Sequence, residues 1–295
     1  MEKIILFGAS RGGENFIKNL GEFYDIIAIA DNDQEKHGKS LNNIEIINPS
    51  TIKSFTFDKV MITSLYFRAI SQQLINIGVP KELIDYAPKN AMKVIQYPFS
   101  KKSILYKAEN LIRLLSDILE GQNYYYTFGT ALGMVRDHGL IPWDDDIDLS
   151  IHANDFEIVK RIIMDNIEKF DAIIENEIVL RKYENEKVAS ISINCLEGNQ
   201  LLFNINLDFI YTKDDYAILE LDKIPLKFFN KPSDYLFKGI QVKLPTQYKD
   251  YLTHVYKDWH IIKKNTNFMN NTTTYVEPTL KVFEEVLHKS KDFIR

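Results

Sequence analysis

Short runs of consecutive aliphatic residues alternate with stretches of helical periodicity in the first third of the chain. Unbroken apolar runs of this length predict strands that are buried on both faces, as in a parallel sheet. Residues 14–20 and 68–77 repeat their apolar positions every three or four residues, which predicts helices that alternate with the strands. The predicted strands are residues 3–7, 25–30 and 59–63. This order indicates a Rossmann-like parallel α/β domain.

The pattern changes after residues 86–102, where two prolines stand among polar residues and indicate a domain boundary. Apolar residues then recur at helical spacing from Ile104 to Leu119. Residues 146–151 and 203–210 alternate apolar with polar positions, which predicts strands with one buried and one polar face. We therefore predict a second domain of mixed α+β architecture. The two predicted domains are residues 1–90 and 100–295.

Composition narrows the class of protein. The chain is 45% hydrophobic and 12% aromatic, which is enough apolar material for ordinary cores and excludes global disorder. A net charge of −5 argues against a dedicated nucleic-acid binder, which usually has a basic face. The single cysteine, Cys195, cannot form an internal disulfide, so we expect a reducing compartment. No apolar run approaches the ~20 residues that span a bilayer. We expect a cytoplasmic protein, with peripheral contact to the inner face of the membrane left open.

A glycine turn follows the first predicted strand. Gly8, Gly12 and Gly13 stand between this strand and the first helix, and Asp31 ends the second strand 23 residues after Gly8. Glycines at this position let backbone amides approach a nucleotide phosphate, and an acid at the end of the second strand can bind a ribose. They also permit a tight turn with no ligand, and Asp31 can be a solvated strand end. Both interpretations remain open.

The candidate catalytic residues lie in the second domain. Asp146 and Asp148 alternate with Ile147 and Leu149, so both carboxylates face the same side of a strand while the aliphatic residues anchor it in the core. A third acid, Asp208, occupies the polar face of the later strand. Carboxylates on rigid strands are the ligands that Mg²⁺ or Mn²⁺ prefers, especially beside a substrate diphosphate. We predict that all three bind metal.

A second turn, at Gly129 and Thr130, precedes these strands. A glycine turn, an Asp-x-Asp strand and a third strand aspartate are the parts of a nucleotidyltransferase fold. Three carboxylates would hold one or two divalent ions against the donor phosphates, and the acid nearest the acceptor hydroxyl can take its proton.

Residues 128–148 (FGTALGMVRDHGLIPWDDDID) resemble the core motif of the LicD family, which includes phosphocholine transferases and fukutin-type ribitol-phosphate transferases. Residues 206–209 resemble the family's later acidic strand, and residues 242–259 resemble its closing segment. The family more often has glycine where this chain has Lys257. The resemblance implies transfer of a phospho-alcohol, such as phosphocholine or ribitol phosphate, from a CDP-linked donor. The implied acceptor is a hydroxyl of a cell-surface glycan, such as lipopolysaccharide or capsule, or of its lipid-linked precursor.

The same resemblance implies roles for individual residues. Asp146, Asp148 and Asp208 would bind the metal and carry catalysis, with Asp208 as the candidate general base. Gly129 and Thr130 would cradle the donor phosphate through backbone amides and a hydroxyl. Arg136 would contact a phosphate, with a salt bridge to the acidic cluster as the alternative. Asp144 and Asp145 would interact with the metal ligands without binding the metal themselves, or would form a loop that rigidifies the start of the strand.

The first domain resembles the amino-terminal domain of PglD-type sugar acetyltransferases, through the glycine turn, residues 31–33 and residues 36–38. This resemblance implies a small Rossmann-like unit that binds a nucleotide sugar. Scaffolding and oligomerisation are the rival roles for this domain.

Three further alternatives remain. The second domain can be a nucleotidyltransferase that uses an NTP donor, because such enzymes share the three acids. It can also be a nucleotide- or glycan-binding protein without catalysis. Arg181 and Lys182, on the predicted strand at residues 178–183, can contact substrate, although we favour a solvated strand edge.

Overall fold

The computed structural model describes residues 1–93, 97–198, 200–219, 221–263, 274, 276 and 282–290. The chain divides into two compact units. Unit 1 comprises Met1–Ile95 with Ile262–Thr272, and unit 2 comprises Gln96–Ile261 with Thr273–Arg295. Within the described part of the chain, no helix has the length and apolar character needed to cross a membrane.

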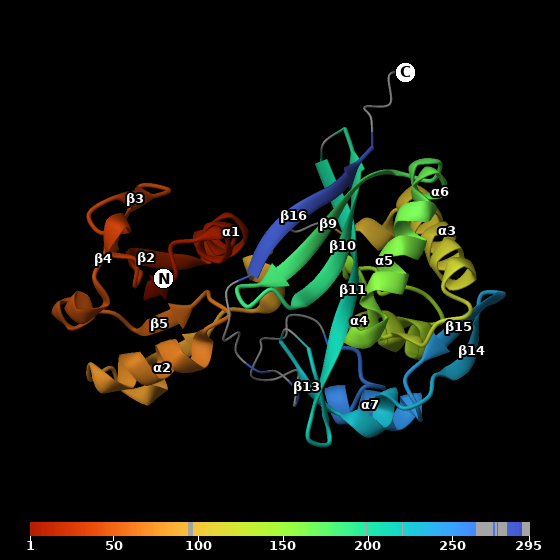
Figure 1. Cartoon of the computed structure of the whole chain (residues 1–295). Coiled ribbons are helices and arrows are strands. Elements are labelled where there is room, and N and C mark those ends of the chain that lie inside the picture. Colours follow the sequence, from red (N-terminus) through yellow and green to blue (C-terminus); the bar gives the residue numbers. More distant parts are fainter. Residues whose placement is uncertain are drawn as a thin grey trace. The chain divides into compact units, whose positions relative to one another are not determined.

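Unit 1 is built on a six-stranded sheet of order β3-β4-β2-β1-β5-β6 (Figure 1). All neighbouring strands are parallel except β3 and β4. Its strands are β1 (Glu2–Phe7), β2 (Tyr24–Ala30), β3 (Ser40–Leu41), β4 (Ile44–Ile47), β5 (Lys59–Ile62) and β6 (Ile84–Tyr86). Its helices are α1 (Arg11–Leu20) and α2 (Phe67–Asn76). The predicted Rossmann-like parallel sheet is confirmed.

The strands of unit 1 are held by aliphatic residues that the sequence presents as unbroken runs. Ile4, Leu6, Ile29 and Phe16 of α1 are fully buried in one cluster. β1 lies between β2 and β5, so β2 and β4 were added on one side of β1 and β5 and β6 on the other. The carboxyl end of β1 is therefore the point where the strand order reverses. Open α/β sheets bind ligands at such a switch point, and the glycine turn lies there.

Unit 2 contains an eight-stranded mixed sheet (Figure 1). Its main path is β13-β12-β11-β10-β9-β16, and β8 pairs in parallel with β11 and antiparallel with β7. Its strands are β7 (Tyr124–Tyr126), β8 (Asp146–His152), β9 (Glu175–Tyr183), β10 (Val188–Glu197), β11 (Gln200–Lys213), β12 (Tyr216–Ile218), β13 (Lys223–Pro225) and β16 (Val282–Lys289), with a separate hairpin of β14 (Ser233–Phe237) and β15 (Ile240–Leu244). The predicted mixed architecture is confirmed.

The helices of unit 2 are α3 (Lys102–Ile118), α4 (Phe128–Leu132), α5 (Phe156–Asp165), α6 (Ile167–Asp171) and α7 (Tyr248–Tyr256), and a π-helical turn, η7 (Gly133–Asp137), continues α4. Helices α3, α5 and α6 lie along one face of the sheet (Figure 1). The ring of Phe156 in α5 packs edge-on against Phe209 of β11, with 5.3 Å between their centroids. Burial raises the pKa of the Cys195 thiol, so this cysteine is a core residue with little thiolate at neutral pH.

The position of β9 corrects one prediction from the sequence. Residues 178–183 were predicted to form a solvated strand edge, but β16 pairs with β9 from the far end of the chain. β9 is therefore an inner strand, and Arg181 and Lys182 point to opposite faces of the sheet.

Candidate active site

The three predicted metal ligands lie on one face of the parallel pair β8 and β11. The register places Asp146 beside Asn204, Asp148 beside Asn206 and Ser150 beside Asp208. Alternate residues of β8, namely Ile147, Leu149 and Ile151, are fully buried on the opposite face. The alternation seen in the sequence therefore separates a packed face from a polar face that carries all three acids.

Asp148 is the centre of this polar face. Asn206 Nδ2 donates to Asp148 Oδ1 at 3.3 Å, and Ser192 Oγ donates to Asn206 Oδ1 at 3.0 Å. Burial and the neighbouring carboxylates of Asp146, Asp208 and Asp144 raise the pKa of Asp148 well above its usual range, although the bond from Asn206 acts against the shift. Four carboxylates thus interact at one place on the sheet.

Asp144 and Asp145 contribute more to this cluster than the sequence indicated. Among the described residues, Asp144, Asp145 and Asp146 place one carboxylate oxygen each within 4.8 Å of the others. The backbone N–H of Asp145 donates to Asp144 Oδ1 at 3.3 Å. Crowded carboxylates repel one another, and a divalent cation with oxygen ligands relieves that repulsion. The donor set therefore fits Mg²⁺ or Mn²⁺; Asp146, Asp148 and Asp208 as the ligands stay a prediction.

The first turn of α4, which contains Phe128, Gly129 and Thr130, holds the cluster in place. A Cβ at Gly129 would lie 2.2 Å from Asp144 Oδ2, so only glycine lets the carboxylate come this close to the backbone. The residue before it, Phe128, has a φ of +46°, and its N–H donates to Tyr251 Oη at 3.2 Å. Thr130 is buried, and its Oγ1 accepts the N–H of Asp148 at 2.9 Å. Thr130 thereby ties the turn to β8, and its contact with a donor phosphate stays a prediction.

Arg136 lies in η7 and pairs with its neighbour. Its Nε and Nη2 donate to the Asp137 carboxylate at 2.8 and 2.6 Å. The side chain of Arg136 is 10% exposed. The sequence left two roles open for Arg136, a phosphate contact and a salt bridge to the acidic cluster, and the structure adds this bidentate pair with Asp137.

Two tyrosines of α7 complete the site, although no pattern in the sequence indicates their role. Burial raises the pKa of Tyr251 and of Tyr256 well above the usual range, and the carboxylate of Asp148 adds to the shift in both. Both phenols are therefore neutral at physiological pH, and each can act only as a neutral hydrogen-bonding group. The hydrogen bond between Tyr251 and Phe128, two residues far apart in sequence, shows that α7 supports the first turn of α4.

Lys257 ends α7 in a conformation that favours glycine. Its φ is +57° and its ψ is −105°, a region that strains any residue with a Cβ. Lys257→Gly is expected to raise the free energy of unfolding by about 1 kcal/mol, because relief of this strain exceeds the entropy that glycine adds to the unfolded chain. Urea denaturation measures the change. Lys257→Ala, which keeps the Cβ, should show no gain; equal stabilisation by alanine would contradict the explanation.

The glycine turn of unit 1 is explained by close packing. Gly8 has a φ of +126°, a Cβ at Gly12 would lie 2.5 Å from the carbonyl oxygen of Thr63, and a Cβ at Gly13 would lie 2.0 Å from that of Gly8. Asp31 closes the same turn, since its Oδ2 accepts the N–H of Ala9 at 2.6 Å. These glycines are thus required by the fold itself, and a nucleotide sugar at Gly8, Gly12, Gly13 and Asp31 stays a prediction.

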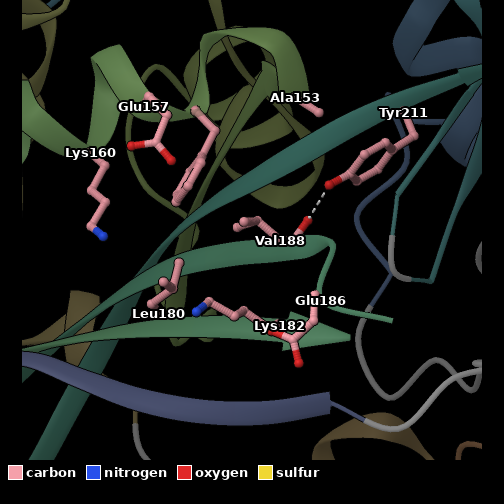
Figure 2. Close-up of a pocket in the computed structure, with 9 residues that line it drawn as sticks. Ala153, Glu157, Lys160, Leu180, Lys182, Glu186, Val188 and Tyr211 are labelled. Atoms are coloured by element: carbon pink, nitrogen blue, oxygen red, sulfur yellow. Dashed lines mark hydrogen bonds between the residues drawn. The ribbon is translucent and has the colours of Figure 1, made fainter. Parts of the chain in front are cut away.

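A cavity of about 400 Å³ lies elsewhere in unit 2, between α5 and the strands β9, β10 and β11 (Figure 2). Lys160, Lys182 and Glu186 line it, and Tyr211 Oη donates to the carbonyl of Val188 at 3.0 Å. Leu180, also in the lining, pairs through Ile191 with Leu207 and so belongs to the packed face of the sheet. The cavity is therefore on the face opposite the carboxylates.

Comparison with known families agrees with this geometry. Residues 121–247 match the model of the LicD/FKTN/FKRP nucleotidyltransferase domain, and residues 1–84 match the model described as C2185-like, N-terminal. Unit 2 is thus built around a nucleotidyltransferase domain. The chain therefore contains a segment similar to the LicD/FKTN/FKRP nucleotidyltransferase domain, preceded by a segment similar to the C2185-like domain.

Individual relatives are distant. The chain is 31% identical over 186 residues to the uncharacterized protein RP689 of Rickettsia prowazekii (strain Madrid E), a match that covers 59% of this chain and 62% of that protein. Among solved structures, the lincosamide antibiotic adenylyltransferase LnuA is 14% identical, with a TM-score of 0.31 and coverage of 52% of this chain and 87% of LnuA. The UDP-N-acetylglucosamine 3-dehydrogenase GnnA from Acidithiobacillus ferrooxidans is 10% identical, with a TM-score of 0.28 and coverage of 88% and 87%. Likeness this low carries no functional conclusion.

Proposed function

We propose that unit 2 transfers a phospho-alcohol from a CDP-linked donor to a hydroxyl of a cell-surface glycan or its precursor, with Mg²⁺ or Mn²⁺. The observation that carries the proposal is the interaction of Asp144, Asp146 and Asp208 with Asp148 on one polar face, within a LicD-type domain. A buried carboxyl whose pKa is raised by burial and by three neighbouring carboxylates is typical of a functional site, and a bound cation would offset the repulsion.

The residues of the site take separate parts in this reaction. Asp146, Asp148 and Asp208 would hold the metal, which when bound neutralises charge on the donor diphosphate. The amides of the turn at Gly129 would orient the phosphates. The acceptor oxygen would then bond to the phosphorus of the alcohol phosphate as the bond to CMP breaks. Asp208 would take the proton of the hydroxyl.

A nucleotidyltransferase that uses an NTP donor is the second candidate, because the same acids serve both reactions. The two differ in the donor that binds: a CDP-alcohol in the first, an NTP in the second. A binding protein without catalysis is less well supported, because all three predicted ligands are present on the polar face. For unit 1 we propose a nucleotide-sugar site at the switch point of its sheet, with scaffolding as the rival role.

Asp208→Asn tests the two roles assigned to Asp208. The variant is expected to lower kcat by about 10²-fold or more at saturating Mg²⁺, because asparagine cannot accept the proton of the acceptor. A titration of activity against Mg²⁺ separates the roles. If the variant regains the full rate once metal is saturating, Asp208 is a metal ligand only and the general-base role is wrong. Asp165→Asn, at an exposed position on α5, is the control and should leave kcat unchanged.

A further inference from the structure

The polar face of the sheet extends beyond the carboxylates. The register places Asp208 beside Ser190 of β10, Ser190 beside Arg181 of β9, and Arg181 beside Glu284 of β16. Residues that are directly paired share a face, so these four side chains form one row across the sheet. Adjacent strands are about 4.8 Å apart, which puts the Cα of Arg181 about 10 Å from that of Asp208. An arginine side chain spans most of that distance.

Ser190 marks the middle of this row as a place for a polar ligand. It is fully buried, and its Oγ has no hydrogen-bond partner in the described part of the chain. Buried hydroxyls are normally satisfied, so an orphan of this kind points to a group that the protein binds. The Arg181 side chain is 30% exposed, although its Nε is buried, and this Nε is 3.5 Å from the mostly exposed carboxylate of Glu284. An ion pair of this length, with its carboxylate mostly in solvent, is weak.

The direction of the reaction places the acceptor at this row. In phosphoryl transfer the attacking and leaving oxygens lie roughly in line, on opposite sides of the phosphorus. The turn at Gly129 follows β7, and β7 pairs with β8 on the side away from β11. If that turn holds the donor diphosphate, the leaving CMP would depart toward β7, and the acceptor would approach from the side of β10 and β9, across Ser190 and Arg181.

We propose that Ser190 and Arg181 form an acceptor subsite for an anionic group, a phosphate or a carboxylate, next to the hydroxyl that Asp208 deprotonates. A guanidinium matches either anion with two parallel hydrogen bonds, and the Ser190 hydroxyl donates a third. Glu284 competes with the ligand for the guanidinium. This inference rests on the proposed function, and it restricts the acceptor to a glycan or precursor that carries negative charge.

The test compares anionic and neutral acceptor analogues on protein saturated with Mg²⁺ and CDP. Calorimetric titrations use two matched pairs: glycerol 3-phosphate with glycerol, and glucuronate with glucose. The wild type should bind the anionic member of one pair more tightly than the neutral member. A preference in the first pair would identify a phosphate, and a preference in the second pair a carboxylate. Arg181→Gln should weaken binding of that anion about tenfold or more, as expected for the loss of a charge-assisted hydrogen bond. Glu284→Gln should strengthen it, and Ser190→Ala should weaken it less.

Lys182→Gln is the matched control, because Lys182 adjoins Arg181 but points to the opposite face and lines the cavity of Figure 2. It should bind the analogues as the wild type does. Equal binding of anionic and neutral analogues by the wild type, or an unchanged preference in Arg181→Gln, overturns the subsite. Binding of CDP with Mg²⁺ is measured first: its absence in the wild type overturns the proposed function, whereas intact CDP binding without anion preference overturns only this inference.

Discussion

Asp148→Asn is expected to abolish turnover and, at the same time, to raise the melting temperature of the metal-free protein. Loss of one metal ligand at the centre of the site should lower kcat by about 10³-fold or more, the scale seen when a member of a catalytic group is removed. The gain in stability follows because asparagine keeps the shape of the side chain and removes a charge that Asp146, Asp208 and Asp144 repel. Differential scanning fluorimetry without metal measures the shift.

The pH dependence of the same variant follows from the raised pKa of Asp148. Folded, metal-free protein holds this proton at pH values where the unfolded chain has released it. Stability of the metal-free protein therefore falls as pH rises from the ordinary aspartate pKa through the raised one, and this contribution is absent in Asp148→Asn. The affinity of the wild type for metal should instead rise with pH, because a carboxylate must be deprotonated to bind a metal ion. Lower stability of Asp148→Asn at neutral pH, without metal, would contradict the account.

Gly13→Ala is expected to unfold unit 1 or to destabilise it by about 3 kcal/mol or more. A Cβ at this position would lie 2.0 Å from the carbonyl oxygen of Gly8, which is backbone and cannot move aside as a flexible side chain could. Urea denaturation and limited proteolysis measure the loss. Gly21→Ala is the matched control, because its Cβ would meet only Ile17 and Ile26 side chains at 3.4 Å or more. Normal stability of Gly13→Ala would show that the turn is built differently.

The same packing limits what a substitution at Gly12 can report. A change to valine would clash with the backbone of Thr63, where a Cβ already approaches to 2.5 Å. Lost nucleotide binding in Gly12→Val would therefore follow from damage to the fold as readily as from damage to a ligand site. Asp31→Asn is the better probe, since it keeps an oxygen for the N–H of Ala9 and removes the charge.

The sequence predicted those features that depend on local alternation. The unbroken aliphatic runs of β1, β2 and β5 predicted a parallel sheet, and the alternation in β8 and β11 predicted a polar face with Asp146, Asp148 and Asp208. Periodicity of two along a strand determines which side chains share a face, and pairing in register then brings those faces together.

The features that the sequence could not predict depend on contacts between distant segments. Nothing in the motif shows that Gly129 is needed to admit the carboxylate of Asp144, or that Tyr251 binds the turn. The pairing of β16 with β9 joins segments about a hundred residues apart, and it changes Arg181 from a solvated edge residue into part of the polar face. Such contacts arise only when the tertiary fold brings the segments together.

The most direct test of the central claim is a binding screen of the whole chain with CDP-choline, CDP-ribitol, CDP-glycerol, CTP and UDP-sugars, each with and without Mg²⁺. A ligand that binds only the folded protein raises its melting temperature. We predict a metal-dependent shift with one CDP-alcohol, which also identifies the donor, and loss of that shift in Asp148→Asn. A metal-dependent shift with CTP alone would favour the nucleotidyltransferase. A shift with a UDP-sugar alone, unchanged in Asp148→Asn, would contradict the proposed function of unit 2.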